Sequence, residues 1–246
     1  MFIECPSGLS GEIRRFKVSD YDLFGDKSLA RKKGPQVSAT ICKRLWENTV
    51  SPGPYEMDDD GNPQWFKDVM EHDRFFILMQ ARIMARGPKY TQRFKCEFDS
   101  CGRFTMWEID LNELEIKKAA DDVIDAFQSG NQFEVILPRC QETVVFELPT
   151  FEVQKRVDAE VQKNGKRLSS VYAGRIKRIG EQTIRSQIWR FVRDLDAEDW
   201  EALDEAFDDV DFGVNTAIEY VCGDDDCALE QTQELILGRD FFIGGR

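Results

Sequence analysis

Histidine is nearly absent from this sequence, which has one, His72, among 246 residues. A hydrolytic triad or a histidine-based metal site would have to use it, yet a lone histidine in a predicted helix is more often a surface or satisfied core residue. Glycine-rich phosphate motifs are also absent, and no carboxylate pair stands out among the 46 acids. The sequence therefore predicts a non-enzymatic protein with no catalytic residues, no cofactor-binding residues and no small-molecule substrate.

Long apolar runs are missing too. None approaches the roughly 20 residues that a membrane-spanning helix needs. The N-terminus, MFIECPSGLSGEIRR, has neither the basic nor the apolar region of a signal peptide. We therefore expect no membrane partner and a reducing cytoplasm, where cysteines serve more often as thiols or metal ligands than as disulfides.

Basic residues are absent from one long segment of a chain whose net charge is −13. Residues 194–238 contain 16 acids and no Lys or Arg, whereas the rest of the chain has 33 bases and 30 acids. Nucleic-acid binding needs clustered Lys and Arg at the phosphates, so this pattern argues against it. An acidic surface suits docking to a basic protein surface. A solvated acidic helix with a loop is the alternative interpretation.

What the chain does contain is one cysteine spacing twice. CEFDSC at Cys96–Cys101 and CGDDDC at Cys222–Cys227 each separate two cysteines by four residues, and strand-like residues flank both pairs. A hairpin tip can aim two sulfurs the same way, and two facing tips bring four thiolates around one zinc ion, as in zinc ribbons. We predict one structural zinc ion per chain, bound by Cys96, Cys101, Cys222 and Cys227.

Three other interpretations of these four cysteines stay open: small buried apolar side chains, a pair of disulfides, and a redox-active pair. The odd total of seven cysteines counts against a complete disulfide framework, and C-x-x-C is the usual redox spacing. The three aspartates between Cys222 and Cys227 raise the pKa of nearby thiols and oppose a four-thiolate site, whereas Lys95 and Arg103 act in the opposite direction.

Apolar periodicity and turn residues predict an α+β fold. The first residues, to about position 24, predict short strands with loops. Asp196 is a suitable N-cap for the last of the expected helices, and Gly87 is a plausible terminator for the second. We expect helices at 37–50, 65–86, 112–130, 151–163, 168–179, 181–195 and 197–210, and hairpins at 90–111, 132–150 and 214–238.

These elements predict a division into four regions. A small β segment and two helices occupy residues 1–90. Zinc-ribbon-like paired hairpins comprise 91–111 plus 214–238. A helical and hairpin insertion, 112–213, lies between them, and an aromatic tail, 239–246, ends the sequence.

Several smaller features carry weaker expectations. The DDDGN stretch at 58–62 departs from a calcium loop at Pro63 and Val69, so we expect a solvated turn. Phe241 and Phe242 form either an exposed docking element or a chain end packed on its own core. The remaining cysteines have no matching spacing and are expected to be buried or incidental thiols: Cys5, Cys42 and Cys140.

Several stretches also follow one another in a recognisable order. They are ECPSGLSGEIR, KSLARKKG before a segment ending in NTVSPGPY, DRFFILMQARIMARGPKY, KCEFDSCGRFTMWEIDLNEL, FDDVDFGVNTAIEYVCGDDDC and GRDFFI. Together they resemble the T4-type baseplate protein family of contractile-tailed bacteriophages, over essentially the whole chain.

The resemblance implies a role in building the tail baseplate, as a hub component or a hub assembly chaperone. It implies other tail proteins as partners, namely hub, wedge or tube components, and a place in the virion after assembly in the host cytoplasm. The four paired cysteines are similar to the zinc-binding cysteines of that family. Two alternatives come from other classes: a zinc-ribbon module that regulates or binds nucleic acid, and a cysteine-based redox enzyme.

Overall fold

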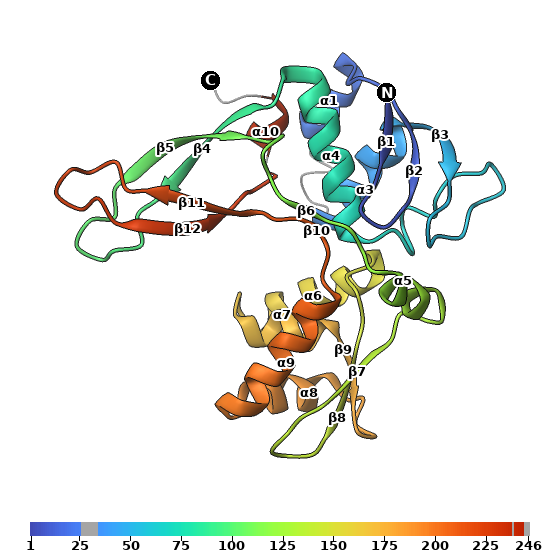
Figure 1. Ribbon diagram of the computed structural model, residues 1–246, viewed down its shortest axis with the longest axis vertical. Helices are drawn as coiled ribbons and strands as arrows, with labels where there is room; N and C mark the ends of the chain where they lie inside the picture. The colour runs from blue at the N-terminus through green and yellow to red at the C-terminus, as the bar shows by residue number, and fades with distance from the viewer. Residues whose placement is uncertain (26–33, 238, 244–246) are drawn as a thin grey trace.

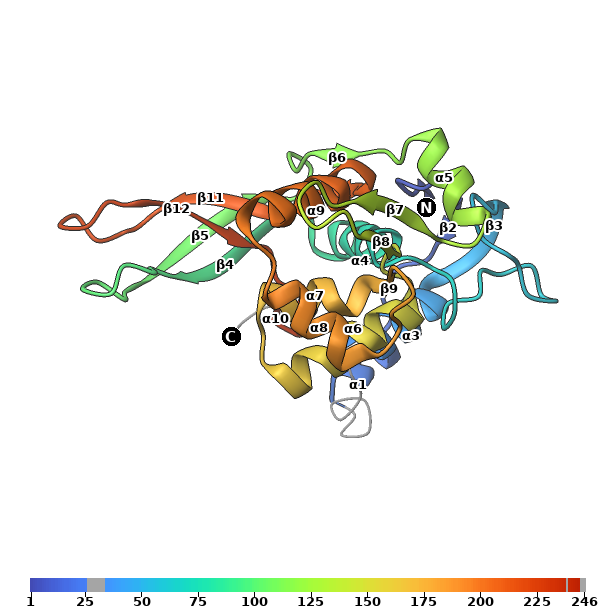
Figure 2. The same ribbon diagram turned by 90° about the horizontal axis from the view of Figure 1, so that it is seen from below.

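The computed structural model describes residues 1–25, 34–237 and 239–243. Helices and small sheets alternate along these residues, and the strand pairings among them are antiparallel, which confirms the α+β class. Three parts can be followed in Figures 1 and 2: an N-terminal sheet with helices, a helical body, and an arm of two hairpins. Among the described helices, none is long and apolar enough to cross a membrane.

The N-terminal part is a three-stranded sheet, of order β1-β2-β3, next to three helices. A side chain at Gly11 would have its Cβ 2.4 Å from the Trp46 ring and 2.3 Å from the Asn48 carbonyl oxygen. Glycine is therefore what allows β2 and β3 to approach so closely. The bounds are β1 Phe2–Glu4, β2 Ser10–Ile13, β3 Trp46–Ser51, α1 Val18–Gly25, α3 Gly34–Leu45 and α4 Glu71–Arg86.

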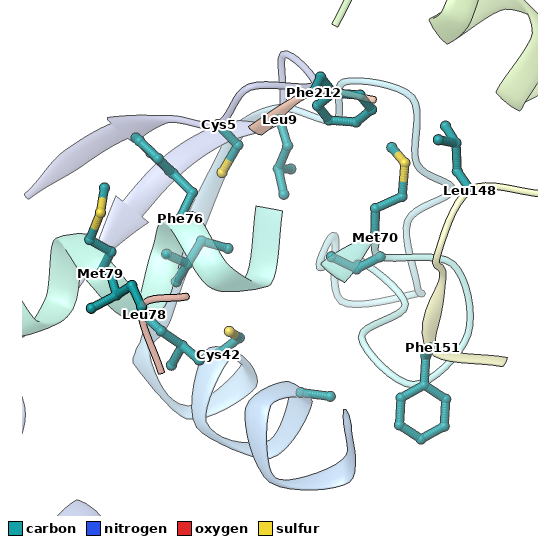
Figure 3. Packing of buried hydrophobic residues seen from close by; sticks show 14 of the residues in the cluster. Cys5, Leu9, Cys42, Met70, Phe76, Leu78, Met79, Leu148, Phe151 and Phe212 are labelled. Carbon is teal, nitrogen blue, oxygen red and sulfur yellow. The ribbon is translucent and has the colours of Figure 1, made fainter. Parts of the chain in front are cut away.

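Helix α4 runs through the centre of the hydrophobic core. Ile77 and Met79 on this helix have no exposed surface. Figure 3 shows Phe76 of α4 and Cys42 of α3 among side chains that fill the same interior. The helix ends before Gly87, whose φ of 79° is one that glycine adopts without strain, as the sequence predicted.

The helical body combines four helices with a sheet of order β7-β8-β9. Thr150 caps α6, and Asp196 caps α9 as predicted; each side chain accepts a hydrogen bond from a backbone N–H of the first turn. Stacked rings of Phe146 and Phe207, 4.2 Å apart, join the sheet to α9. The bounds are β7 Phe133–Ile136, β8 Thr143–Phe146, β9 Ile176–Ile179, α6 Phe151–Asn164, α7 Leu168–Arg175, α8 Arg185–Arg193 and α9 Ala197–Val210.

The chain enters and leaves this body side by side, through the antiparallel pair β6 (Ile116–Lys117) and β10 (Gly213–Val214). Helix α5 (Asp121–Gln128) follows β6. His72, in the first turn of α4, lies against the exit: its Nε2 is 2.8 Å from Asp211 Oδ1, and its ring is 4.5 Å from that of Phe212. The lone histidine thus packs at the junction between the two parts.

Several predicted element boundaries were wrong. The helix expected at 112–130 is β6 followed by α5, and the helix expected at 168–179 ends at Arg175 because Ile176–Ile179 adds to the sheet as β9. The helix expected at 65–86 begins at Glu71, since residues 64–68 form turns.

The N-terminal expectation was also incomplete. Residues 18–25 form α1 instead of strand or loop, and the helix expected at 37–50 gives way to β3 at Trp46. Part of the basic KSLARKKG stretch, and residues 244–246 of the expected tail, lie outside the described residues.

The chain end packs onto the core. Phe241 and Phe242, on α10 (Arg239–Ile243), are 0% and 4% exposed. Arg82 Nε donates a hydrogen bond to the Phe241 carbonyl oxygen at 2.9 Å. The interpretation of these two rings as an exposed docking element is therefore wrong.

A buried carboxylate ties three segments of the N-terminal part together. Asp73 of α4 has no exposed surface. It accepts hydrogen bonds from the Ser7 hydroxyl, from the Ser7 backbone N–H at 3.3 Å, and from the Tyr55 hydroxyl at 2.5 Å. Burial raises the pKa of Asp73, and the hydrogen bonds from Ser7 and Tyr55 lower it in opposition.

We predict that Asp73→Ala lowers the free energy of unfolding by about 3 kcal/mol, because it leaves buried donors on Ser7 and Tyr55 without an acceptor. Urea denaturation monitored by circular dichroism measures this change. Asp59→Ala, at an exposed loop position, is the control and should stay within about 0.5 kcal/mol of the parent. Equal effects of the two substitutions would contradict the structural role of Asp73.

Candidate metal centre

Each predicted cysteine pair lies at the tip of a hairpin. Cys96 and Cys101 join β4 (Lys89–Lys95) to β5 (Phe104–Asp110), and Cys222 and Cys227 join β11 (Ala217–Val221) to β12 (Glu230–Glu234). The first cysteine of each pair closes its tip through its backbone N–H, which donates to Arg103 O at 2.7 Å in one hairpin and to Leu229 O at 3.0 Å in the other. Both predicted hairpins are confirmed.

The two hairpins pack face to face along an aromatic seam. Period-2 alternation turns Phe94 of β4 and Tyr220 of β11 inward, and their rings stack with centroids 4.7 Å apart. Trp107 of β5 meets the same tyrosine at 6.4 Å. Figures 1 and 2 both show the hairpins side by side, projecting together from the rest of the molecule as one arm.

Polar groups fix the register between the hairpins. The Gly223 backbone N–H donates to Thr105 Oγ1 at 2.8 Å, and Gln92 Nε2 donates to the Glu234 carbonyl oxygen at 2.9 Å. Gln231 Oε1 accepts from the Glu97 backbone N–H at 2.7 Å. The first and third of these bonds join the hairpins near the tip of the arm, and the second joins them toward its base.

This packing brings together the four sulfurs that the sequence singled out. All four Sγ atoms lie within 4.8 Å of one another. The distance is 3.8 Å between Cys96 and Cys227 and 3.8 Å between Cys101 and Cys222. Sulfurs placed about 2.3 Å from a central zinc ion form a tetrahedron with edges of about 3.8 Å. The cluster therefore has the dimensions of a closed four-thiolate site.

The same distances bear on two of the alternatives. A disulfide needs sulfurs about 2.05 Å apart, and the cysteines of the described residues are all free thiols. Cys96 and Cys222 are buried, but Cys101 and Cys227 are only half-buried, so burial as small apolar side chains does not explain the whole cluster.

Hydrogen bonds spread the pKa values of these thiols apart. Burial raises the pKa of Cys96, but the Phe98 backbone and the Gln231 side chain outweigh it and lower the pKa to about 7. The Arg103 backbone lowers the pKa of Cys101, but burial and the neighbouring thiols outweigh it and raise the pKa to about 12. One thiol of the cluster thus ionises near neutrality, whereas holding all four as thiolates requires a cation.

One of the three aspartates expected to oppose a thiolate site is neutralised. Asp224 lies 2.9 Å from Arg103 Nε, in an ion pair that joins the two hairpin tips. Its carboxylate also accepts a hydrogen bond from Cys101 Sγ at 3.6 Å. Asp225 and Asp226 are exposed to solvent, where their field is screened.

The remaining candidate residues lie elsewhere. Cys5 and Cys42 are buried in the N-terminal core, and Cys140 is exposed on the helical body. Burial raises the pKa of Cys42 to about 12, as expected for an inert thiol. Asp58 Oδ1 accepts from the backbone N–H of Asn62 at 2.8 Å, in the turn expected at 58–62.

Sequence reasoning missed two residues of this site. Tyr220 lies two positions before Cys222, so alternation alone could have placed it on the inner face. Gln231, whose Nε2 is 3.1 Å from Cys96 Sγ, had no such signal, because its position depends on the register between hairpins far apart in sequence.

We predict that Gln231→Leu raises the pKa of Cys96 by about one unit in metal-free protein, because it removes a donor to the thiolate. The pH dependence of iodoacetamide alkylation at Cys96, followed by peptide mass spectrometry, measures the shift. Thr232→Val, on the exposed face of the same strand, should leave the midpoint near the parent value of about 7. A midpoint that does not move in Gln231→Leu would contradict the assigned hydrogen bond.

Comparison with known proteins gives one match. A family model described as T4 bacteriophage base plate protein matches residues 2–242, nearly the whole chain, including both hairpins of the arm. No curated protein and no solved structure gives a significant match. The family resemblance seen in the sequence is confirmed: the chain belongs to the family of T4 bacteriophage base plate proteins.

Proposed function

We propose that this baseplate protein works without catalysis, at the hub of the phage tail baseplate, as a structural component or assembly chaperone that acts through protein contacts. The observation that carries the proposal is a continuous acidic face on α9. Membership of the baseplate family supports contacts with other tail components, and a face of one charge sign supports a basic partner surface.

The acidic face of α9 consists of exposed side chains at helical spacing: Glu198, Glu201, Glu205 and Asp208. The opposite side of the helix buries Leu203 and Phe207. Within the described residues, none of the four acids forms a side-chain ion pair. Like charges three or four residues apart destabilise a helix by a few tenths of a kcal/mol per pair. Binding of a basic partner to this face would offset that loss of helix stability, whereas folding alone does not offset it.

Reversing this face tests the proposal. In a phage whose own copy is disabled, we predict that a Glu198→Lys, Glu201→Lys, Glu205→Lys triple variant lowers the yield of complete tails at least about tenfold, equivalent to about 1.4 kcal/mol of lost binding. Tail counts by electron microscopy and plaque titre measure the effect.

The matched control reverses three acids on a distant exposed loop: Glu56→Lys, Asp59→Lys and Asp60→Lys. This variant should complement like the parent. Normal tails from the α9 variant would sink the proposed contact. The protein content of purified particles distinguishes a structural component from an assembly chaperone, because only the structural component stays in the virion.

For the arm, the supported function is a structural zinc site with Cys96, Cys101, Cys222 and Cys227 as ligands, one ion per chain. The four sulfurs have the spacing of a tetrahedral site. An ion there would offset half of the charge of the four thiolates and would clamp the two hairpins together. Residues 112–213 are then an insertion between the halves of a metal-closed unit formed by 91–111 and 214–238, with 1–90 and 239–246 as the flanking regions.

We predict one zinc ion per chain by elemental analysis, with the four thiols of the cluster, Cys96, Cys101, Cys222 and Cys227, protected until denaturation. Removing the ion with a strong chelator, or Cys101→Ser, should lower Tm by about 10 °C, because a structural zinc site contributes several kcal/mol to the folded state. Cys140→Ser, at an exposed thiol outside the cluster, should bind zinc and melt like the parent. Metal-free protein with freely reactive cysteines would overturn this site.

A further inference from the structure

The outward face of the first hairpin carries a compact cationic patch near the tip of the arm. It consists of Arg93, Lys95, Phe104 and Met106, all exposed. The strand register places Arg93 opposite Met106 and Lys95 opposite Phe104, so the four side chains are neighbours on one surface. The Arg93 guanidinium carbon lies 3.7 Å from the centre of the Phe104 ring.

The charge of this patch is not paired within the part of the chain that the structure describes. Lys89, at the base of the same hairpin, pairs with Glu108 at 3.5 Å and Asp110 at 3.4 Å. Neither Arg93 nor Lys95 forms an ion pair with any described residue. The distal half of the face therefore combines positive charge with exposed apolar surface.

The outward face of the second hairpin carries the opposite charge. Its acidic patch consists of Glu219, Val221, Glu230 and Thr232, again all exposed. The register places Glu219 opposite Thr232 and Val221 opposite Glu230. Glu234 extends the same face toward the base, and the surrounding segment, 194–238, contains no Lys or Arg.

We infer that the cationic patch of one copy of this protein binds the acidic patch of a second copy. The spacings agree: the two cations, on alternate residues of a strand, are about 6.6 Å apart along it, and the two carboxylates, on diagonal positions of a strand pair, are about 7–8 Å apart. When the two patches face each other, Phe104 and Met106 of one copy contact the exposed Val221 of the other. The cations and carboxylates of the two patches pair around this apolar contact.

The geometry of the arm sets the symmetry of this contact. The two patches lie on opposite outer faces of a two-layer arm, since the inner faces of both hairpins are packed together through Phe94 and Tyr220. Because the two patches do not share a face, a twofold contact would set each patch against the same patch of the second copy, like charge against like charge. The contact is therefore head-to-tail, and repetition of it builds either a closed ring or an open stack.

This self-association uses a different surface from the acidic face of α9, so each can fail without the other. The contact is small because the arm is short: the seven residues of β4 extend only roughly 23 Å. Stable interfaces are larger and bury about 800 Å² per partner. We therefore expect weak association, measured by sedimentation velocity up to about 500 μM, that weakens as NaCl rises from 50 to 500 mM.

Charge reversal in complementary pairs gives the decisive test. Arg93→Glu with Lys95→Glu, and separately Glu219→Lys with Glu230→Lys, should each weaken self-association at least tenfold. An equimolar mixture of the two variants should associate again, because each supplies the face that the other lacks. Recovery on mixing also shows that both variants are folded. The triple lysine variant of α9, with three charge reversals elsewhere on the molecule, should associate like the parent.

Three results would overturn the inference. The parent protein could sediment as a monomer at every concentration. The reversed variants could associate as the parent does, or fail to associate on mixing. Finally, a labelled oligonucleotide could bind the parent but not the Arg93→Glu, Lys95→Glu variant while the parent stays monomeric, which would assign the cationic patch to nucleic acid instead.

Discussion

The architecture depends on one long-range closure, the packing of two hairpins whose cysteines are 121 residues apart in the chain. Neither hairpin is stable by itself, because a two-stranded sheet with one apolar face leaves that face in water. Stacked Phe94 and Tyr220, and the hydrogen bonds across the seam, give each hairpin its missing layer. The entropy of closing the intervening loop grows slowly with its length, so an insertion the size of the helical body is compatible with this closure.

Charge is arranged around that closure in a consistent way. Where opposite charges from the two hairpins meet at the tips of the arm, they pair, as Arg103 does with Asp224. On the outer surfaces near the tip of the arm they are separated by hairpin, with cations on the first and carboxylates on the second. The acidic face of α9 adds a second negatively charged surface, on the helical body. The strongly negative net charge thus arises from residues 194–238, and the protein presents distinct faces to its surroundings.

The four-cysteine cluster could be predicted from the sequence because its signals are local. Two equal cysteine spacings inside strand-like flanks required two hairpin tips, and a shared ligand set required the tips to meet. The N-cap at Asp196 and the terminator at Gly87 were likewise visible, since each acts on its own neighbours. These features depend on contacts within a few residues.

What could not be predicted depends on partners distant in sequence. Ile176–Ile179 continues a helical pattern and becomes β9 only because β8 offers an open edge. Trp46 fits the apolar period of α3, yet it begins β3. It can pair with β2 there because Gly11 has no side chain to clash with the Trp46 ring. Gln231 reaches Cys96 through a register that neither hairpin specifies alone. In each case tertiary packing overrides local propensity.

The order of the two hairpins in the chain has a consequence for synthesis. A ribosome completes the first hairpin long before the second, and at about 5–20 residues per second the delay is on the order of ten seconds. Throughout that interval Phe94 and Trp107 have no layer to cover them, and Cys96 and Cys101 lack the other two thiols of their cluster. The helical body has time to fold in between. The arm therefore closes after the helical body has been synthesised, and its closure reports that translation has passed residue 234.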